Sequence, residues 1–254
     1  MNAEANTPIR SWSRYRVIRN ALRVFIGALI GYFLVAYLIM PAVWQRTAAR
    51  HPALDDAPRI SHTKNGIPGD PLNVGLVGSE RDLVRALAAA NWQPADPVTF
   101  ASCARIARTT AFRRPYENAP VSPLFVWSRK QDMAFEQSVG HDPSRRHHVR
   151  FWRSETLDDQ GRPFWIGGAT YDRKVGLSNT TLQITHHIAA DVDTERDKMI
   201  QDLHEAGCLQ NTYWVEAFHK VLEGRNGGGD RYHTDGKLAV GVIALPGEVT
   251  TNGE

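Results

Sequence analysis

The 254-residue sequence predicts an α+β domain that follows a single transmembrane helix near the N-terminus. Three observations predict this: an uncharged apolar run at 24–45, several short segments with alternating apolar residues, and about three segments with helical periodicity. We therefore expect a mixed or mainly antiparallel sheet with about three helices packed on it. The composition, 42% hydrophobic and 22% charged, is that of a folded protein.

The apolar run "VFIGALIGYFLVAYLIMPAVWQ" (24–45) is long enough to cross a bilayer, which takes about 20 residues. A secretory signal peptide has a shorter apolar region of about 7–15 residues, so this run favours an uncleaved anchor. Trp44, near its end, is a residue type that favours the membrane interface. Gly27 and Gly31 form one GxxxG pair, which could bring two such helices together as a dimer.

The charges beside the run predict its orientation. Five arginines precede it and three follow it within a similar distance: Arg10, Arg14, Arg16, Arg19 and Arg23 before, and Arg46, Arg50 and Arg59 after. The positive-inside rule then favours a cytoplasmic tail at 1–23 and an extracytoplasmic domain on the plasma (inner) membrane of a bacterial cell envelope. The lipid membrane is the first expected partner and another membrane protein the second. A formal net charge of only +3 does not predict a nucleic-acid partner.

Residues 46–69 are rich in proline and polar residues and have no apolar period, so we expect a linker there. The domain is expected at 70–246, with a short tail at 247–254. Cys103 and Cys208 would suit an oxidising compartment if they pair, and the alternative is that both are ordinary buried thiols.

The first half of the domain contains two predicted helices and three predicted strands. "PLNVGLVG" (71–78) is a short apolar strand. Ser79 is a favourable N-cap for the next helix because Asp82 follows three residues later. A second helix is expected at 99–112, and strands at 123–129 and 133–139 around a turn near Arg129–Asp132.

The second half is richer in strands. Alternation predicts a strand at 147–154, joined by a polar turn to another at 161–173, with a further strand at 182–189. A helix at 191–207 ends at Gly207, and Asp191 or Asp193 caps its start. The last two strands are expected at 211–219 and 237–245.

The two histidine doublets indicate where a site lies. In the strand "HHVRFWRS" side chains alternate between faces, so His147 joins the core-facing set and His148 and Arg150 point to an exposed face. By the same rule His187 lies opposite His186. If the two strands are neighbours, His148, Arg150 and His187 converge. The alternative is that His147 and His186 are hydrogen-bonded core histidines and the others are solvated.

The loop "NGGGDRYHTDG" (226–236) is the second unusual feature. Its three glycines allow close backbone approach to a ligand, and Asp230, His233 and Asp235 could instead hold a cation. The alternative is a flexible hairpin connection. A mixture of histidine, arginine and aspartate suits an anionic, phosphate-bearing ligand. The candidate ligand-binding residues are His148, Arg150, Asp172, Arg173, His187, Asp230 and Arg231.

Several long segments resemble one known family. They are "PLNVGLVGSERDLVRALAAANW", "RPYENAPVSPLFVWSRKQDMAFEQ", "RRHHVRFWR", "TYDRKVGLS", "QITHHIAADVDTERD" and "NGGGDRYHTDGKLAV". Over roughly residues 70–243 the chain resembles the LssY C-terminal domain family. The resemblance implies a domain of uncharacterised biochemical function, often attached in relatives to multi-pass membrane domains such as DedA-like and phosphatidic-acid-phosphatase-like ones. This chain has only one predicted span, so that phosphatase activity is not implied, and the resemblance supplies no catalytic residues.

Two hypotheses for function follow. The first is a membrane-anchored, non-catalytic accessory module that binds an anionic envelope molecule or a membrane partner, because the sequence has no GxSxG, HExxH or P-loop motif. The alternative is a metal-assisted phosphoester or other ester hydrolase with a His/Asp/Arg site. It needs about three protein ligands around one ion. No other cofactor is predicted, and the candidate metal ligands are His148, His187, Asp172 and Asp230.

Overall fold

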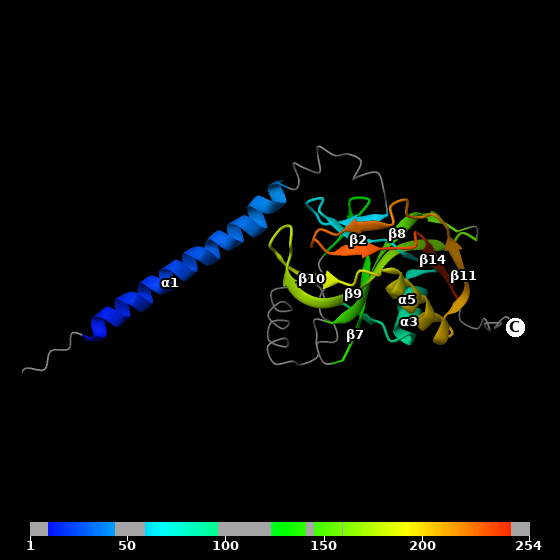
Figure 1. Ribbon diagram of the computed structural model, residues 1–254. Coiled ribbons are helices and arrows are strands. Elements are labelled where there is room, and N and C mark those ends of the chain that lie inside the picture. Colours follow the sequence, from blue (N-terminus) through cyan, green and yellow to red (C-terminus); the bar gives the residue numbers. More distant parts are fainter. Residues whose placement is uncertain (1–9, 44–58, 96–122, 141–144, 159, 245–254) are drawn as a thin grey trace, which may run out of the picture.

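A computed structural model describes residues 10–43, 59–95, 123–140, 145–158 and 160–244 (Figure 1). It has an α+β domain preceded by an apolar helix, as predicted. The predicted helix at 99–112 and Cys103 lie outside these ranges, so the pairing of Cys103 with Cys208 stays a prediction.

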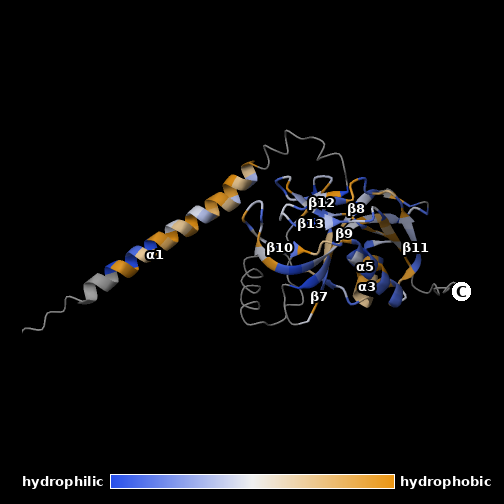
Figure 2. Ribbon diagram, in the orientation of Figure 1, coloured by the Kyte–Doolittle hydropathy of each residue, from blue (hydrophilic) through white to orange (hydrophobic). Residues whose placement is uncertain are grey.

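Helix α1 (Arg10–Leu34) continues as a π-helical segment, η1 (Val35–Ile39), and stands out from the domain as a long rod. Its 28-residue stretch Arg16–Val43 is long and apolar enough to cross a membrane. Figure 2 shows that apolar residues dominate its C-terminal part. Apart from the adjoining backbone of the helix itself, no atom of the described chain lies within 4 Å of the position that a Cβ would take at Gly27 or Gly31. The role of these two glycines in a dimer stays a prediction.

An eight-stranded sheet forms the middle of the domain. Its order is β11 (Leu209–Val215), β14 (Leu238–Ile243), β3 (Val74–Val77), β9 (Pro163–Leu177), β8 (Arg146–Leu157), β7 (Met133–Ser138) and β4 (Gln93–Pro94), with β10 (Ile184–Ile188) also paired to β9. Among these strand pairs β14–β3 is parallel and the others are antiparallel, which confirms the mixed sheet.

Two helices, α3 (Glu80–Ala89) and α5 (Asp193–Glu205), cover one face of this sheet. Ser79 caps α3 in a capping box with Asp82, as predicted. The N-cap of α5 is Val192, and the preceding Asp191 carboxylate accepts hydrogen bonds from the backbone N–H groups of Asp193 (3.0 Å) and Thr194 (3.2 Å) at the start of the helix. The buried core on this side joins both helices to the sheet: Leu83, Leu87, Met199 and Leu203 pack with Val149 and Phe151.

A second layer covers the opposite face. It contains a four-stranded sheet in the order β2 (Pro68–Pro71), β1 (Ile60–His62), β5 (Phe125–Val126) and β6 (Arg129–Lys130), and a hairpin of β12 (Glu223–Arg225) and β13 (Arg231–His233). Leu124 and Val126 pack there against Trp152 and Ile166 of the large sheet. The middle of the large sheet, β3, β14 and most of β8 and β9, is therefore buried on both faces, whereas most of the edge strand β11 is exposed.

Three predictions are wrong. The second layer overturns the first of them, and hairpin turns overturn the other two. The face of β8 predicted to be exposed is buried under the second layer, with His148 3%, Arg150 5% and Trp152 1% exposed. Residues 60–69 are not linker, because their breakers form the β1–β2 hairpin, with Gly66 at φ 76°. The predicted strand at 123–129 is instead a tight hairpin, because Trp127 and Ser128 both have positive φ.

Candidate functional site

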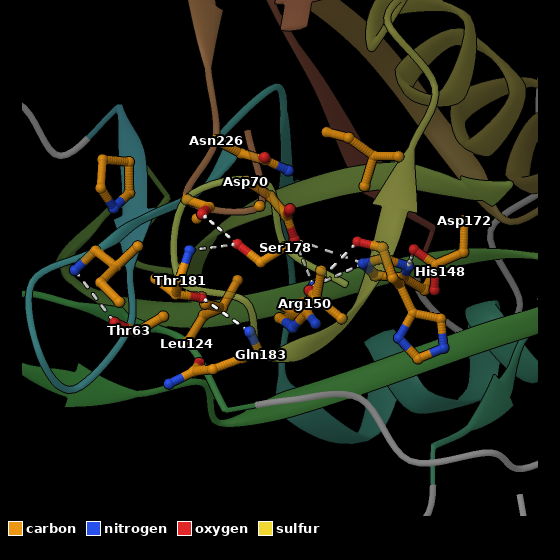
Figure 3. Close-up of a pocket in the computed structure, with 18 residues that line it drawn as sticks. Thr63, Asp70, Leu124, His148, Arg150, Asp172, Ser178, Thr181, Gln183 and Asn226 are labelled. Carbon is orange, nitrogen blue, oxygen red and sulfur yellow. Dashed lines mark hydrogen bonds and ion pairs between the residues drawn. The ribbon is translucent and has the colours of Figure 1, made fainter. Parts of the chain in front are cut away.

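A pocket of about 170 Å³ lies between the second layer and one end of strands β8, β9 and β10. Loop residues of three hairpins, β1–β2, β9–β10 and β12–β13, form its walls. Figure 3 shows Asp70, His148, Arg150 and Asp172 converging on it.

Beneath the pocket lies a buried cluster of charges. Arg146 on β8 donates hydrogen bonds to Glu136 on β7 (2.6 Å) and to Asp172 on β9 (3.0 Å), and all three side chains are buried. The strand register produces this contact, because Arg146 pairs with Asp172 across β8–β9 and Glu136 pairs with His148 across β7–β8. Sequence reasoning missed Arg146 and Glu136, although alternation places Arg146 on the same face as His148 and Arg150.

His148 and Arg150 form the part of the cluster that lines the pocket. The His148 Nδ1 atom lies 3.2 Å from Asp172, and its Nε2 atom lies 2.9 Å from the Thr170 hydroxyl and 2.6 Å from Arg150. Arg150 Nη1 donates to Asp70, at the end of β2, over 2.5 Å. Sequence reasoning missed Asp70, because it sits in the stretch interpreted as the start of the domain rather than in a motif.

The ion pairs overcome the cost of burying these groups. Burial raises the pKa of Asp70, but the positive charges of Arg150 and His148 lower it by a larger amount. The net pKa of Asp70 therefore lies below its usual value. Burial also raises the pKa of Asp172, and nearby His148 and other positive groups outweigh it, leaving a pKa far below normal. Burial lowers the pKa of His148, but the Asp172 carboxylate more than compensates and the net pKa is raised. Both carboxyls are therefore ionised, and His148 gains protons more readily than an exposed histidine.

Arg150 lines the pocket and has one buried donor without a partner among the described residues. Its side chain is only 7% exposed, and within the part of the chain that the structure describes its Nε atom has no hydrogen-bond partner. A buried donor of this kind is costly unless a ligand or water satisfies it. Asn226 lines the same pocket and uses its carbonyl oxygen to accept from the Asp230 N–H, so its NH₂ group adds a second donor.

The loops hold the pocket walls in place. Ser178 Oγ accepts hydrogen bonds from the N–H groups of Thr180 (3.2 Å) and Thr181 (3.0 Å), which folds the β9–β10 loop. Gly227 N–H donates to the Pro68 carbonyl at 2.6 Å, and a Cβ at Gly227 would lie 2.0 Å from Ile67 Cγ2. The close approach that the glycines permit is thus to the β1–β2 hairpin, and the glycine-rich loop is a hairpin connection that also forms one wall.

Of the seven predicted site residues, the structure brings His148, Arg150 and Asp172 together at the pocket. His187 and Asp230 pair with each other at 2.8 Å, and neither lines the pocket. Arg173 donates to the Ile188 carbonyl, and Arg231 is exposed on β13.

His186, and not His187, lines the pocket with His148. His186 and His187 pair in regular register with Val175 and Lys174, so they lie on opposite faces of β10 as alternation predicts, but alternation could not tell which of the two meets the pocket. Burial and the nearby Arg146 lower the pKa of His186 to about 4, although Asp172 acts in the opposite direction. His147 lies 2.6 Å from Glu195 of α5, as the alternative of a hydrogen-bonded core histidine predicted.

The four predicted metal ligands form two separate pairs, His148 with Asp172 and His187 with Asp230. Among the residues that the structure describes, no three histidine, cysteine or acidic side chains are grouped closely enough to hold a metal ion. Asp235, the other acidic residue of the glycine-rich loop considered for a cation, pairs with Arg196 at 2.7 Å. The metal-assisted hydrolase hypothesis therefore gains no support from the geometry.

Comparison with known proteins gives one match. A family model described as "LssY C-terminus" matches residues 54–238, which is well over half of the chain and includes every residue named above as lining the pocket. No curated protein and no solved structure matches the chain.

Proposed function

The chain belongs to the LssY C-terminus family, and we propose that its domain is a membrane-anchored, extracytoplasmic binding module whose pocket takes a small anionic group. Arg150 carries this proposal, since it is a buried guanidinium that lines the pocket. Guanidinium groups bind phosphates and carboxylates through their fork of N–H donors.

The size of the pocket supports a small ligand group. Its volume of about 170 Å³ is below the range of about 300–1,000 Å³ that is usual for sites of drug-sized ligands. Polar atoms supply about half of its surface, and the polar side chains include Thr63, Ser178, Thr181, Gln183 and Asn226. A single charged group with oxygen acceptors suits these dimensions and donors better than a large apolar molecule.

The charges of the cluster connect ligand binding to pH. Three carboxylates face two guanidinium groups, so the cluster has an excess negative charge unless His148 is protonated. Asp172 raises the pKa of His148, so this histidine takes up a proton at a higher pH than an exposed histidine does. We expect anion binding to tighten as the pH falls through the pKa of His148.

Replacing Arg150 by glutamine tests the proposal. We expect the full-length protein, purified in detergent, to bind inorganic phosphate in calorimetric titrations, and R150Q to bind it at least about tenfold more weakly through loss of a charge-assisted contact. R153Q is the matched control, because Arg153 lies on the same strand with an exposed side chain. Because R150Q leaves Asp70 unpaired, the double variant R150Q/D70N is measured too. Equal phosphate binding by folded R150Q/D70N and the unmodified protein would exclude Arg150 as the ligand contact.

The proposed orientation has its own test. Reporter fusions at residue 254 are expected to be active on the extracytoplasmic side and inactive in the cytosol, since five arginines precede the apolar run and three follow it. Fusions before Val24 serve as the control and should report the opposite side. A cytosolic carboxyl end would contradict the proposed location of the pocket.

A further inference from the structure

The β9–β10 loop joins the pocket to the apolar helix. The Tyr32 hydroxyl of α1 donates a hydrogen bond to the Leu182 carbonyl (2.9 Å), and the Gln183 side-chain amide donates to the Ala36 carbonyl (2.8 Å). Figure 1 shows this loop beside the C-terminal end of α1. Two hydrogen bonds thus connect residues about 150 positions apart in sequence.

The sequence explains why the Ala36 carbonyl is available. In η1 the Met40 N–H bonds to the Val35 carbonyl, which is the i to i+5 pattern of a π-helix. The corresponding partner of Ala36 would be residue 41, and this is a proline with no N–H. A carbonyl without a partner is costly in an apolar environment. Gln183 supplies the missing donor, so the loop and the helix fit one another chemically.

The contact lies well inside the apolar segment. Ala36 is seven residues before Val43, the last described residue of the apolar stretch, or roughly 10 Å at about 1.5 Å per residue. The loop carries two large apolar side chains that remain exposed, Leu177 (51%) and Leu182 (47%). If α1 spans a bilayer, these leucines lie at the level of its lipid.

Ser178, Thr181 and Gln183 of this loop also line the pocket. From this juxtaposition we propose that the pocket opens at the membrane surface and that its anionic occupant is the phosphate of a lipid headgroup, which enters from the bilayer. The inference rests on the proposed function and names its ligand class. The pocket is large enough for a headgroup phosphate but not for acyl chains, which would lie outside it along Leu177 and Leu182.

The test compares a lipid with a soluble anion on the full-length protein in detergent micelles. The probes are phosphatidylglycerol and phosphatidylcholine added to the micelles, and inorganic phosphate added to the buffer. We expect phosphatidylglycerol to bind at least about tenfold more tightly than inorganic phosphate, because two leucines add apolar contact with the acyl chains. Phosphatidylcholine is expected to bind more weakly than phosphatidylglycerol.

The double variant L177D/L182D separates the two sources of phosphate. We expect it to lose the preference for lipid while its affinity for inorganic phosphate is unchanged. Leu182 has φ 59°, which aspartate adopts more readily than leucine, so the loop should keep its conformation. L157D is the matched control, since Leu157 is 57% exposed at the opposite end of the β8–β9 hairpin.

Each remaining outcome bears on one proposal. If inorganic phosphate binds as tightly as phosphatidylglycerol and L177D/L182D changes neither affinity, the ligand is a soluble anion and only the lipid inference is overturned. Phosphatidylcholine has the same phosphodiester with a choline cation beside it, so if it binds as tightly as phosphatidylglycerol, the net charge of the headgroup does not select the lipid and the proposed preference for an anionic headgroup is overturned. If neither phosphate nor any lipid binds, the proposed function itself is overturned.

Discussion

Replacing Arg146 by methionine is expected to lower the free energy of unfolding of the domain by about 3–5 kcal/mol. Arg146 is 1% exposed and donates to both Glu136 and Asp172, which are equally buried. Methionine fills a similar volume, so the main loss is charge compensation for two carboxylates that water cannot reach. Thermal or urea unfolding of the full-length protein in detergent measures the change.

R145M is the control for this substitution. Arg145 directly precedes Arg146 but is exposed, so its replacement should change stability by no more than about 0.5 kcal/mol. The triple variant E136Q/R146M/D172N removes all three charges and should recover part of the stability that R146M loses. If R146M were as stable as R145M, the cluster would not be a buried charge network.

Replacing His186 by glutamine is expected to remove most of the acid sensitivity of the protein between pH 6.5 and pH 4. His186 has a folded-state pKa of about 4. An unfolded histidine titrates near 6.5, so below that pH the unfolded state takes up a proton that the folded state refuses. Stability is therefore fully present above about pH 6.5 and falls as the pH drops toward 4, by up to about 3 kcal/mol. Unfolding curves at several pH values measure this slope.

The other groups with shifted pKa values affect stability at pH values outside the range from about 4 to 6.5, with the exception of His219. The raised pKa of His148 gives stability that is present below its unfolded pKa and is lost as the pH rises through the folded value. The lowered pKa values of Asp70 and Asp172 give stability that is lost only below about pH 3.8. Burial lowers the pKa of His219, so it acts in the same direction as His186 and should account for the slope that remains.

H204Q is the control for the histidine substitution, because His204 is exposed on α5. This variant should keep the acid-dependent loss of stability. An identical slope in H186Q and the unmodified protein would show that His186 is not held neutral in the pocket.

Features that depend only on neighbouring residues could be predicted from the sequence alone. The uncharged run predicted the apolar helix, and Ser79 with Asp82 predicted the start of α3. Alternation predicted which residues of β8 share a face, and His148 with Arg150 indeed lie on the pocket side. Caps, alternation and apolar runs act over a few residues, so no knowledge of the rest of the chain is needed to detect them.

How these faces are covered, and which distant residues meet, could be learned only from the folded chain. Arg150 binds Asp70, which lies 80 residues away in the sequence. The pocket-side face of β8 is buried only because the second layer packs on it. On β10, His186 on one face lies at the pocket, and His187 on the other face pairs with Asp230. Strand register depends on pairing between distant segments, because a slip of one residue exchanges the two faces of a strand. The covering of the sheet by the second layer and the contact of Gln183 with Ala36 also join segments that are far apart in sequence.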